Sequence, residues 1–309
     1  MTTTTRAADD SSRPLVSVVV PFLDAGRFLR EAIDSVCAQT YDRWELILVD
    51  DGSTDESRDV ARTAASALDR VRYLQHPGGV NRGTSASRNL GVRHSRGELI
   101  AFLDGDDVWL PGKLEAQVAL LACHPEVGAL YGQTEYWYSW TGNPDDRNRD
   151  TVPDVGVEST RVVQPPNQLI RCLLGTVTVP CTCSIVVRAD VLTRVGGWEE
   201  SFTGMFDDQA FYAKLMLREP VLVATELWDR YRRHPTSMYQ TAKREGTVRS
   251  ARLDYLTWVR NYVRERRVAS GALSRAIERA IWLERHPRLV QALGEHRVRR
   301  WAIPKLEDA

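Results

Sequence analysis

Three apolar segments of the sequence end in aspartate, and stretches with helical spacing lie between them. They are VSVVVPFLD from residue 16, ELILVDDGS from residue 45 and ELIAFLDGDD from residue 98. Runs of branched apolar residues without alternation are typical of strands buried on both faces. Strands that alternate with helices of about 10 to 15 residues predict βαβ units and a largely parallel sheet. We therefore expect an α/β domain whose aspartates gather at the carboxyl ends of neighbouring strands, where such sheets bind ligands.

The third segment places Asp104 and Asp106 two positions apart, so their side chains point to the same side of an extended chain. Two carboxylates about 4 Å apart repel by ~4 kcal/mol at an effective dielectric constant of about 20, so a cation or a proton must offset them. Mg²⁺ and Mn²⁺ are hard ions that take carboxylate and phosphate oxygens. The tripeptide is therefore a candidate metal and diphosphate site, although an acidic surface turn would explain it if it stood alone. We expect Asp107 to cap the turn that follows.

Four stretches follow one another along the chain between about Val16 and Tyr239. They read VSVVVPFLDAGRFLREAIDSVCAQTY, ELILVDDGSTDES, NRGTSASRNLGVRHSRGELIAFLDGDD and GGWEESFTGMFDDQAFYAKL. Together they resemble the family 2 glycosyltransferases of GT-A fold. The resemblance implies a mostly parallel central sheet flanked by helices, followed in this chain by a C-terminal helical extension. It also implies a nucleotide-sugar donor and Mn²⁺ or Mg²⁺ as cofactor.

The resemblance implies nucleotide-sugar-binding roles for five residues. Pro21 and Leu23 follow the first strand and would cradle the base, although the family usually has tyrosine at the position of Leu23, and leucine offers no aromatic face. Asp51 would hydrogen-bond the edge of the nucleobase. Arg88 would lie beside the nucleotide, where it could also offset Asp51, and an ordinary surface arginine is the alternative. Asp104 would lie near the ribose.

The resemblance places the metal and the chemistry on other side chains. Asp106 would bind the metal together with His234 of YRRHPTSM, for which a structural histidine is the alternative. Asp208 would be the general base that takes the acceptor proton during an inverting attack. It follows Asp207, where the family usually has glutamate. The alternative for both acids is a favourable interaction with the dipole of a helix that begins here.

Charge separates the C-terminal region from the rest of the chain. Lys and Arg equal Asp and Glu at 41 each, so the overall charge gives no sign of nucleic-acid binding. From Lys243 onward, basic residues outnumber acidic ones two to one. We expect a disordered lead (1–14), a nucleotide-sugar-binding half (15–110), an acceptor-binding and catalytic-base half (111–240), and a basic helical region (241–309).

Two explanations are open for the basic helices: a solvated helical cap, or docking on an anionic membrane surface. No stretch approaches the ~20 apolar residues that span a bilayer, and the N-terminus lacks the apolar core of a signal peptide. We therefore expect a cytoplasmic protein, and the second explanation would place it peripherally at the inner face of the membrane.

The sequence thus predicts an inverting, metal-dependent glycosyltransferase of polysaccharide, glycolipid or other glycoconjugate biosynthesis. Its donor would be a nucleotide-diphosphate sugar, with a UDP-sugar favoured over a dTDP- or GDP-sugar, and its acceptor a glycan, a lipid-linked molecule or a small molecule. A sugar-nucleotidyltransferase is one alternative, but it would need a Gly-rich basic loop after the first strand, and PFLDAGRFL has none. A non-catalytic nucleotide- or sugar-binding module is the other, although binding alone requires no base.

Overall fold

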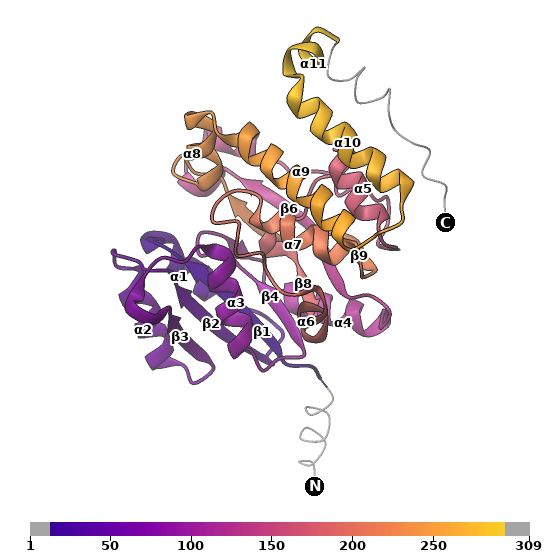
Figure 1. Cartoon of the computed structure of the whole chain (residues 1–309). Helices are drawn as coiled ribbons and strands as arrows, with labels where there is room; N and C mark the ends of the chain where they lie inside the picture. Colours follow the sequence, from indigo (N-terminus) through magenta and orange to yellow (C-terminus); the bar gives the residue numbers. More distant parts are fainter. Residues whose placement is uncertain (1–12, 294–309) are drawn as a thin grey trace.

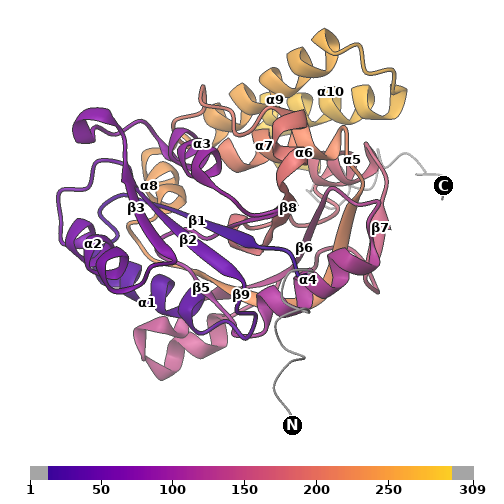
Figure 2. The same cartoon turned by 90° about the horizontal axis from the view of Figure 1, so that it is seen from below.

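The computed structural model describes residues 13–293 and shows helices packed on both faces of a central sheet (Figures 1 and 2). Most of the expected disordered lead, residues 1–12, lies outside the described residues, as do residues 294–309 of the basic region. The last residues of that lead are placed, because the Tyr41 hydroxyl donates a hydrogen bond to the Pro14 carbonyl at 2.6 Å.

The first half of the sheet is parallel, as expected from its valine- and isoleucine-rich segments. Its strands are β1 (Val16–Phe22), β2 (Trp44–Asp50), β3 (Val71–Gln75) and β4 (Leu99–Phe102). The helices between them are α1 (Gly26–Cys37), α2 (Ser57–Ala67) and α3 (Thr84–His94). Val16 is paired with both Trp44 and Leu99, so the ends of β1, β2 and β4 lie side by side. This register brings the aspartates that follow these strands to one edge.

The second half of the sheet is mixed. It contains β5 (Val108–Trp109), α4 (Lys113–Cys123), β6 (Ala129–Trp137), β7 (Arg161–Val163), α5 (Asn167–Leu174), β8 (Val186–Arg188), α6 (Ala189–Val195), α7 (Asp207–Met216) and β9 (Val221–Arg232). The strand order is β3-β2-β1-β4-β8-β6-β9-β5, with β7 also paired to β9. The short strand β8 runs antiparallel to both β4 and β6, while β6 and β9 form a long parallel pair. The predicted α/β sheet flanked by helices is confirmed, with the antiparallel strand β8 joining its two parallel parts.

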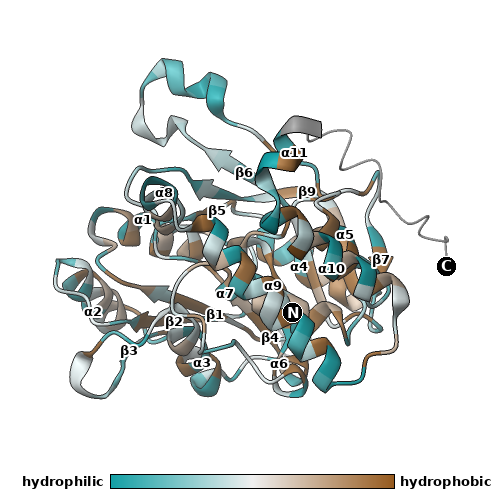
Figure 3. Cartoon of the chain, turned by 45° about the horizontal axis from the view of Figure 1, so that its top comes forward, coloured by the Kyte–Doolittle hydropathy of each residue, from teal (hydrophilic) through white to brown (hydrophobic). Residues whose placement is uncertain are grey.

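Each face of the sheet has its own hydrophobic core, which explains the uninterrupted apolar runs. In β1, Val18 and Val20 pack in a core with Leu29 of α1, while Val19 belongs to the core on the opposite face. All seven residues of β1 are buried. Figure 3 shows hydrophobic residues along the strands and hydrophilic residues on the outer faces of the helices. Burial on both faces therefore selects valine at consecutive positions of this strand.

The C-terminal helices complete the second of these cores. They are α8 (Met238–Glu245), α9 (Val248–Glu265), α10 (Gly271–Arg285) and α11 (Pro287–Leu293). Leu256 and Val259 of α9 and Ile277 of α10 are buried in the same cluster as Phe211 of α7. The extension is thus packed onto the body of the domain.

Several basic side chains of the extension are paired within it. Arg252 contacts Glu284 at 2.7 Å and Arg260 contacts Glu278 at 3.8 Å, so α9 and α10 neutralise part of each other's charge. This pairing favours the solvated cap over the membrane surface, and peripheral membrane contact stays a prediction. Within residues 13–293, every helix is too short or too polar to span a bilayer.

Candidate active site

The Asp-x-Asp turn lies at the end of β4, against the end of β1. The backbone N–H of Asp107 donates to the Asp104 carbonyl at 3.1 Å, which closes the turn. Gly105 fits the turn against β1, because a Cβ atom there would lie only 2.9 Å from the Cβ of Phe22. The side chains of Asp104 and Asp106 are 30% and 31% exposed and remain accessible.

Asp107 does not cap the turn, so that expectation was wrong. Its side chain is buried, and its Oδ1 accepts a hydrogen bond from the backbone N–H of Arg232 at 2.8 Å. Burial raises the pKa of Asp107 well above its ordinary value, and the charges of Asp106 and Asp104 add to the rise. This carboxyl group joins the turn to the end of β9.

Arg88 is the central cation of the site. It is only 3% exposed, and it donates to Asp104 Oδ1 at 2.6 Å and to Asp207 Oδ2 at 2.7 Å. The Trp198 ring covers its guanidinium at 4.3 Å. Arg88 therefore ties α3, the Asp-x-Asp turn and the start of α7 together. The expectation that it offsets Asp51 was wrong, because α7 brings Asp207 to it instead, and its burial excludes an ordinary surface arginine.

Asp207 and Asp208 open α7, as the sequence predicts for the FDDQAF segment. Asp208 is half-buried beside Asp207, and its Oδ1 accepts the Gln209 backbone N–H at 2.7 Å. Burial, followed by the charge of Asp207, raises the pKa of Asp208 to about 7. The helix dipole would lower this pKa, so burial outweighs it. A carboxyl group of this kind can exchange a proton near neutral pH.

His234 and Asp106 form a pair next to the Asp-x-Asp turn. Nε2 of His234 lies 2.9 Å from Oδ2 of Asp106, and Nδ1 lies 2.9 Å from Thr236 Oγ1. Two donors that each lie ~2.1 Å from one ion at a right angle are themselves about 3 Å apart. The pair therefore fits a shared divalent ion. Within residues 13–293, no group of three or more His, Cys, Asp or Glu side chains is placed to hold a metal.

The predicted base-binding side of the site lies at the ends of β1 and β2. Pro21 is buried in β1, while Leu23 just beyond it is 45% exposed. Asp51 is buried, and its carboxylate accepts the backbone N–H groups of Arg82 at 2.7 Å and Gly83 at 3.0 Å. Asp51 thus holds the loop that leads into α3. Its contact with a nucleobase stays a prediction.

The family model for Glycosyl transferase family 2 matches residues 17–196. The chain belongs to glycosyl transferase family 2. The matched segment contains Asp51, Arg88, Asp104 and Asp106 but ends before Asp208. The family match therefore does not depend on the acid pair of α7. The position of that pair beside Arg88 is known from the structure.

Relatives of this family 2 chain match it over about a third of its length. It is 42% identical over 115 residues to the putative glycosyltransferase EpsE of Bacillus subtilis, covering 37% of this chain and 41% of that protein. It is 36% identical over 111 residues to the putative teichuronic acid biosynthesis glycosyltransferase TuaG of the same species, covering 35% and 42%. The matches therefore span less than half the length of these curated relatives.

Solved structures extend the similarity over most of this family 2 chain. Staphylococcus aureus TarS 1–349 in complex with UDP-GlcNAc aligns with a TM-score of 0.65 at 18% identity, covering 88% of this chain and 72% of TarS. The mannosyltransferase PcManGT of Pyrobaculum calidifontis, in complex with GDP-Man and Mn²⁺, aligns with a TM-score of 0.60 at 18% identity, covering 91% and 76%. These similarities confirm the predicted GT-A fold.

One buried residue of the site has a structural role that sequence reasoning missed. Arg232 is 1% exposed, lies between the rings of Phe28 and Trp137, and donates to the Asp106 carbonyl and to Glu31, each at 2.7 Å. The available signal was a basic residue at the carboxyl end of a strand, but the partners of this side chain lie on α1 and on the Asp-x-Asp turn.

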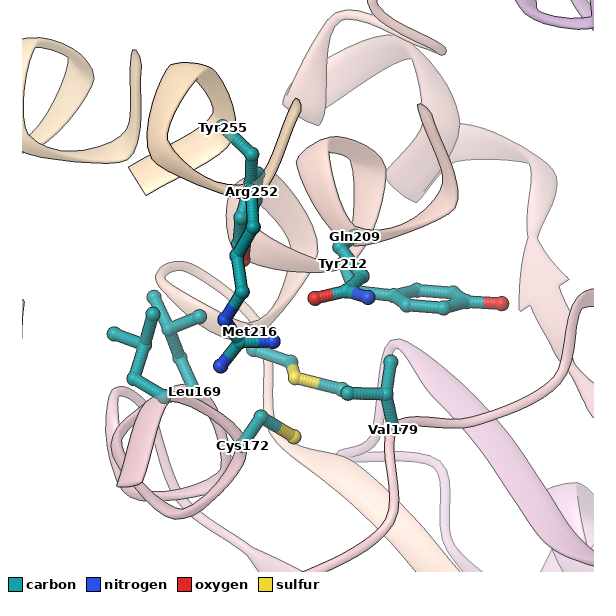
Figure 4. A pocket seen from close by; sticks show the side chains of 9 residues that line it. Leu169, Cys172, Val179, Gln209, Tyr212, Met216, Arg252 and Tyr255 are labelled. Carbon is teal, nitrogen blue, oxygen red and sulfur yellow. The ribbon is translucent and has the colours of Figure 1, made fainter. Parts of the chain in front are cut away.

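A pocket lies between α5, α7 and α9. Figure 4 shows the Arg252 side chain of α9 reaching toward Cys172 of α5 and Met216 of α7. The pocket is lined by Leu169, Cys172, Leu173, Val179, Gln209, Tyr212, Met216, Arg252 and Tyr255. None of the predicted donor, metal or base residues lines it, so it does not define the active site.

Proposed function

We propose that this family 2 chain transfers a sugar from a nucleotide-diphosphate donor to an acceptor hydroxyl group with inversion of configuration. Asp208 is the general base in this proposal. It takes the proton of the acceptor hydroxyl while that oxygen attacks the anomeric carbon from the side opposite the leaving diphosphate.

The environment of Asp208 carries the proposal. Its pKa near 7 suits a base that must accept a proton at neutral pH. The ion pairs of Arg88 with Asp104 and Asp207 hold the start of α7 close to the Asp-x-Asp turn. The proposed base therefore follows directly on an ion-paired group that contains Arg88 and Asp104, two of the predicted donor-binding residues.

Asp106 and His234 would hold a divalent ion, Mn²⁺ or Mg²⁺. When bound, the ion supplies positive charge that stabilises the departing diphosphate. Because these two side chains provide only two donors, the remaining positions would be filled by diphosphate oxygens and water, as Mg²⁺ prefers. The Mn²⁺ in the structure of the mannosyltransferase supports this part of the proposal.

The solved neighbours and the curated relatives support a class of donor and a pathway. TarS was solved with UDP and with UDP-GlcNAc, and the mannosyltransferase with GDP-Man, so we propose a nucleotide sugar and favour a UDP-sugar. TuaG is named for teichuronic acid biosynthesis. We therefore propose a role in the biosynthesis of a polysaccharide or another glycoconjugate.

Substitution of the base tests the proposal. Asp208→Asn keeps the size of the side chain but cannot accept the proton, so release of nucleoside diphosphate from the donor should fall by about 10²- to 10⁴-fold. The stabilisation that UDP-GlcNAc with Mn²⁺ gives in a thermal-shift assay should persist. Asp59→Asn, an exposed acid in the first turn of α2, is the matched control. Unchanged turnover in Asp208→Asn would reject Asp208 as the base.

A further inference from the structure

At the carboxyl ends of β6 and β9, side chains point to two opposite faces of the sheet. The side chains on the two faces have different interaction partners. Neighbouring residues of a strand point to opposite faces. Arg230 and Arg232 share one face, where each contacts the Trp137 ring. Tyr231 and Arg233 lie on the other face. The two faces can therefore have separate functions.

Arg233 lies among four tyrosines. Its guanidinium carbon is 5.1 Å from the ring centroid of Tyr136, 5.2 Å from that of Tyr231, 5.7 Å from that of Tyr239 and 5.9 Å from that of Tyr138. These five residues are called the tyrosine–arginine cluster below. Tyr239, in the first turn of α8, is 39% exposed, so the cluster is open to solvent on that side.

Arg233 differs in its partners from the two arginines on the opposite face. In the described part of the chain no Asp or Glu forms an ion pair with it, whereas Arg230 pairs with Glu135 and Arg232 with Glu31, each at 2.7 Å. Tyrosine rings attract a cation, and their hydroxyl groups can accept its hydrogen bonds, but neutral phenols leave the positive charge in place. A half-buried guanidinium without a counter-charge is ready to receive an anion from outside.

The tyrosine–arginine cluster lies next to the Asp-x-Asp turn. Arg233 follows Arg232, whose backbone N–H donates to Asp107 Oδ1 at 2.8 Å, and precedes His234, whose Nε2 lies 2.9 Å from Asp106 Oδ2. Burial raises the pKa of Tyr136, and the charge of Asp208 contributes to that rise. Burial likewise raises the pKa of Tyr231, with Asp107 and Asp106 among the contributing charges. The cluster therefore adjoins the Asp-x-Asp turn, and the charge of Asp208 acts on one of its tyrosines.

We propose that the tyrosine–arginine cluster is an acceptor subsite that binds an anionic group, a phosphate or a carboxylate, carried by the acceptor sugar or polyol. Arg233 binds the anion by charge-assisted hydrogen bonds, and the tyrosine rings offer flat apolar surfaces to the carbon skeleton. The subsite rests on the proposed transferase function, because it places the acceptor beside Asp208. The donor diphosphate would bind elsewhere, at the proposed metal site of Asp106 and His234.

The experiment measures binding of two anionic probes, glycerol 3-phosphate and glucuronate, and of their neutral counterparts glycerol and glucose, by calorimetric titration of the full chain. The wild-type chain should bind at least one anion and neither neutral compound. Arg233→Gln should weaken binding of that anion by about 10- to 100-fold. Arg233→Lys keeps the positive charge but loses the planar guanidinium group. Its affinity for the anion should lie between that of the wild type and that of Arg233→Gln.

Two further variants locate the anion. Arg230→Gln removes a paired arginine from the opposite face of the same strand and should bind like the wild type. Asp106→Asn disrupts the proposed metal site and should also keep the affinity for the anion. Comparing glycerol 3-phosphate with glucuronate shows whether the subsite selects phosphate or carboxylate.

The inference is overturned if neither anion binds saturably to the wild-type chain, or if Arg233→Gln binds as tightly as the wild type. It is also overturned if Asp106→Asn abolishes anion binding, because the anion would then occupy the donor site. Stabilisation by UDP-GlcNAc and Mn²⁺ is measured on the same samples. If that stabilisation persists while the subsite fails, only the subsite is wrong. If neither UDP-GlcNAc nor GDP-Man stabilises the chain in the presence of Mn²⁺, the proposed function itself fails.

Discussion

The ring of Phe206 stacks on the ring of Tyr255, with centroids 5.6 Å apart and an interplanar angle of 9°. Phe206 has a positive φ of 69° and directly precedes the acid pair that opens α7. Tyr255 belongs to α9, outside the segment that matches the family. The C-terminal extension thus fixes the position of Phe206, which lies two residues before the proposed base.

Tyr255→Ala should damage both stability and turnover. Tyr255 is buried, so loss of its ring leaves a cavity that costs about 3–5 kcal/mol of unfolding free energy. Without the stack, the start of α7 can shift, and a displaced base slows turnover by on the order of 10- to 100-fold. Chemical denaturation and nucleotide release measure the two effects.

Tyr255→Phe is the matched control, because it keeps the ring and removes only the hydroxyl group. It should stay within about 1 kcal/mol of the wild type and retain its turnover. If Tyr255→Ala, at a temperature where it is folded, turns over as fast as Tyr255→Phe, α9 does not position the base.

Turnover should depend on pH through Asp208. The base works only when deprotonated, and its pKa is raised from 3.8 to about 7. At saturating donor, turnover should therefore rise with pH below about 7 and level off above it. The rise should disappear from the residual activity of Asp208→Asn. A wild-type profile that is flat through neutral pH would contradict the assignment.

The same raised pKa predicts how this group affects stability. Between pH 3.8 and about 7 the folded chain keeps the Asp208 proton while the unfolded chain loses it. Because the folded state then binds more protons, the free energy of unfolding falls as pH rises through this window. Asp208→Asn does not titrate, so denaturation midpoints of this variant should fall less with pH than those of the wild type.

Metal dependence should follow Asp106 and His234. A chelator should abolish nucleotide release, and Mn²⁺ should restore it. Substitution of residues that only hydrogen-bond to metal ligands typically lowers metal affinity by about 10- to 100-fold. Loss of a ligand should have at least as large an effect, so His234→Ala should raise the Mn²⁺ concentration for half-maximal activity at least about tenfold. His124→Ala, a partly exposed histidine on another part of the chain, should leave the Mn²⁺ titration unchanged. Equal Mn²⁺ titrations for the two variants would remove His234 from the metal site.

The buried ion pair of Lys113 and Asp229 predicts a strong stability effect. Both side chains are fully buried, with Nζ 3.3 Å from Oδ2, and Thr134 donates to Asp229 Oδ1 at 2.6 Å. Lys113→Met leaves a buried carboxylate without its cation and should lower the free energy of unfolding by about 3–5 kcal/mol. Adding Asp229→Leu should recover part of this loss, which urea denaturation of the single and double variants would measure. A double variant less stable than Lys113→Met would contradict this account.

The local sequence was sufficient to predict the strands and the sheet edge at which the acidic residues lie. Val18 and Val20 face one core and Val19 faces the other, so an uninterrupted valine run already implies two covered faces. Parallel strands end at one edge, which is why Asp51 and Asp104 could be placed near each other from their positions after β2 and β4. The family resemblance likewise implied a helix that begins at the acid pair, and α7 begins at Asp207.

The partners of the charged groups were decided by the tertiary structure. Arg88 meets Asp207 across 119 positions of sequence because α7 docks against α3 and the Asp-x-Asp turn. Asp107 is buried because β9 closes over it, and Arg233 differs from Arg232 because strand alternation sends them to opposite faces. Local pattern determined which segments are strands and helices, since burial and backbone geometry act over a few residues. Long-range packing determined which charges pair, because a charge interacts with whichever side chain the fold places beside it.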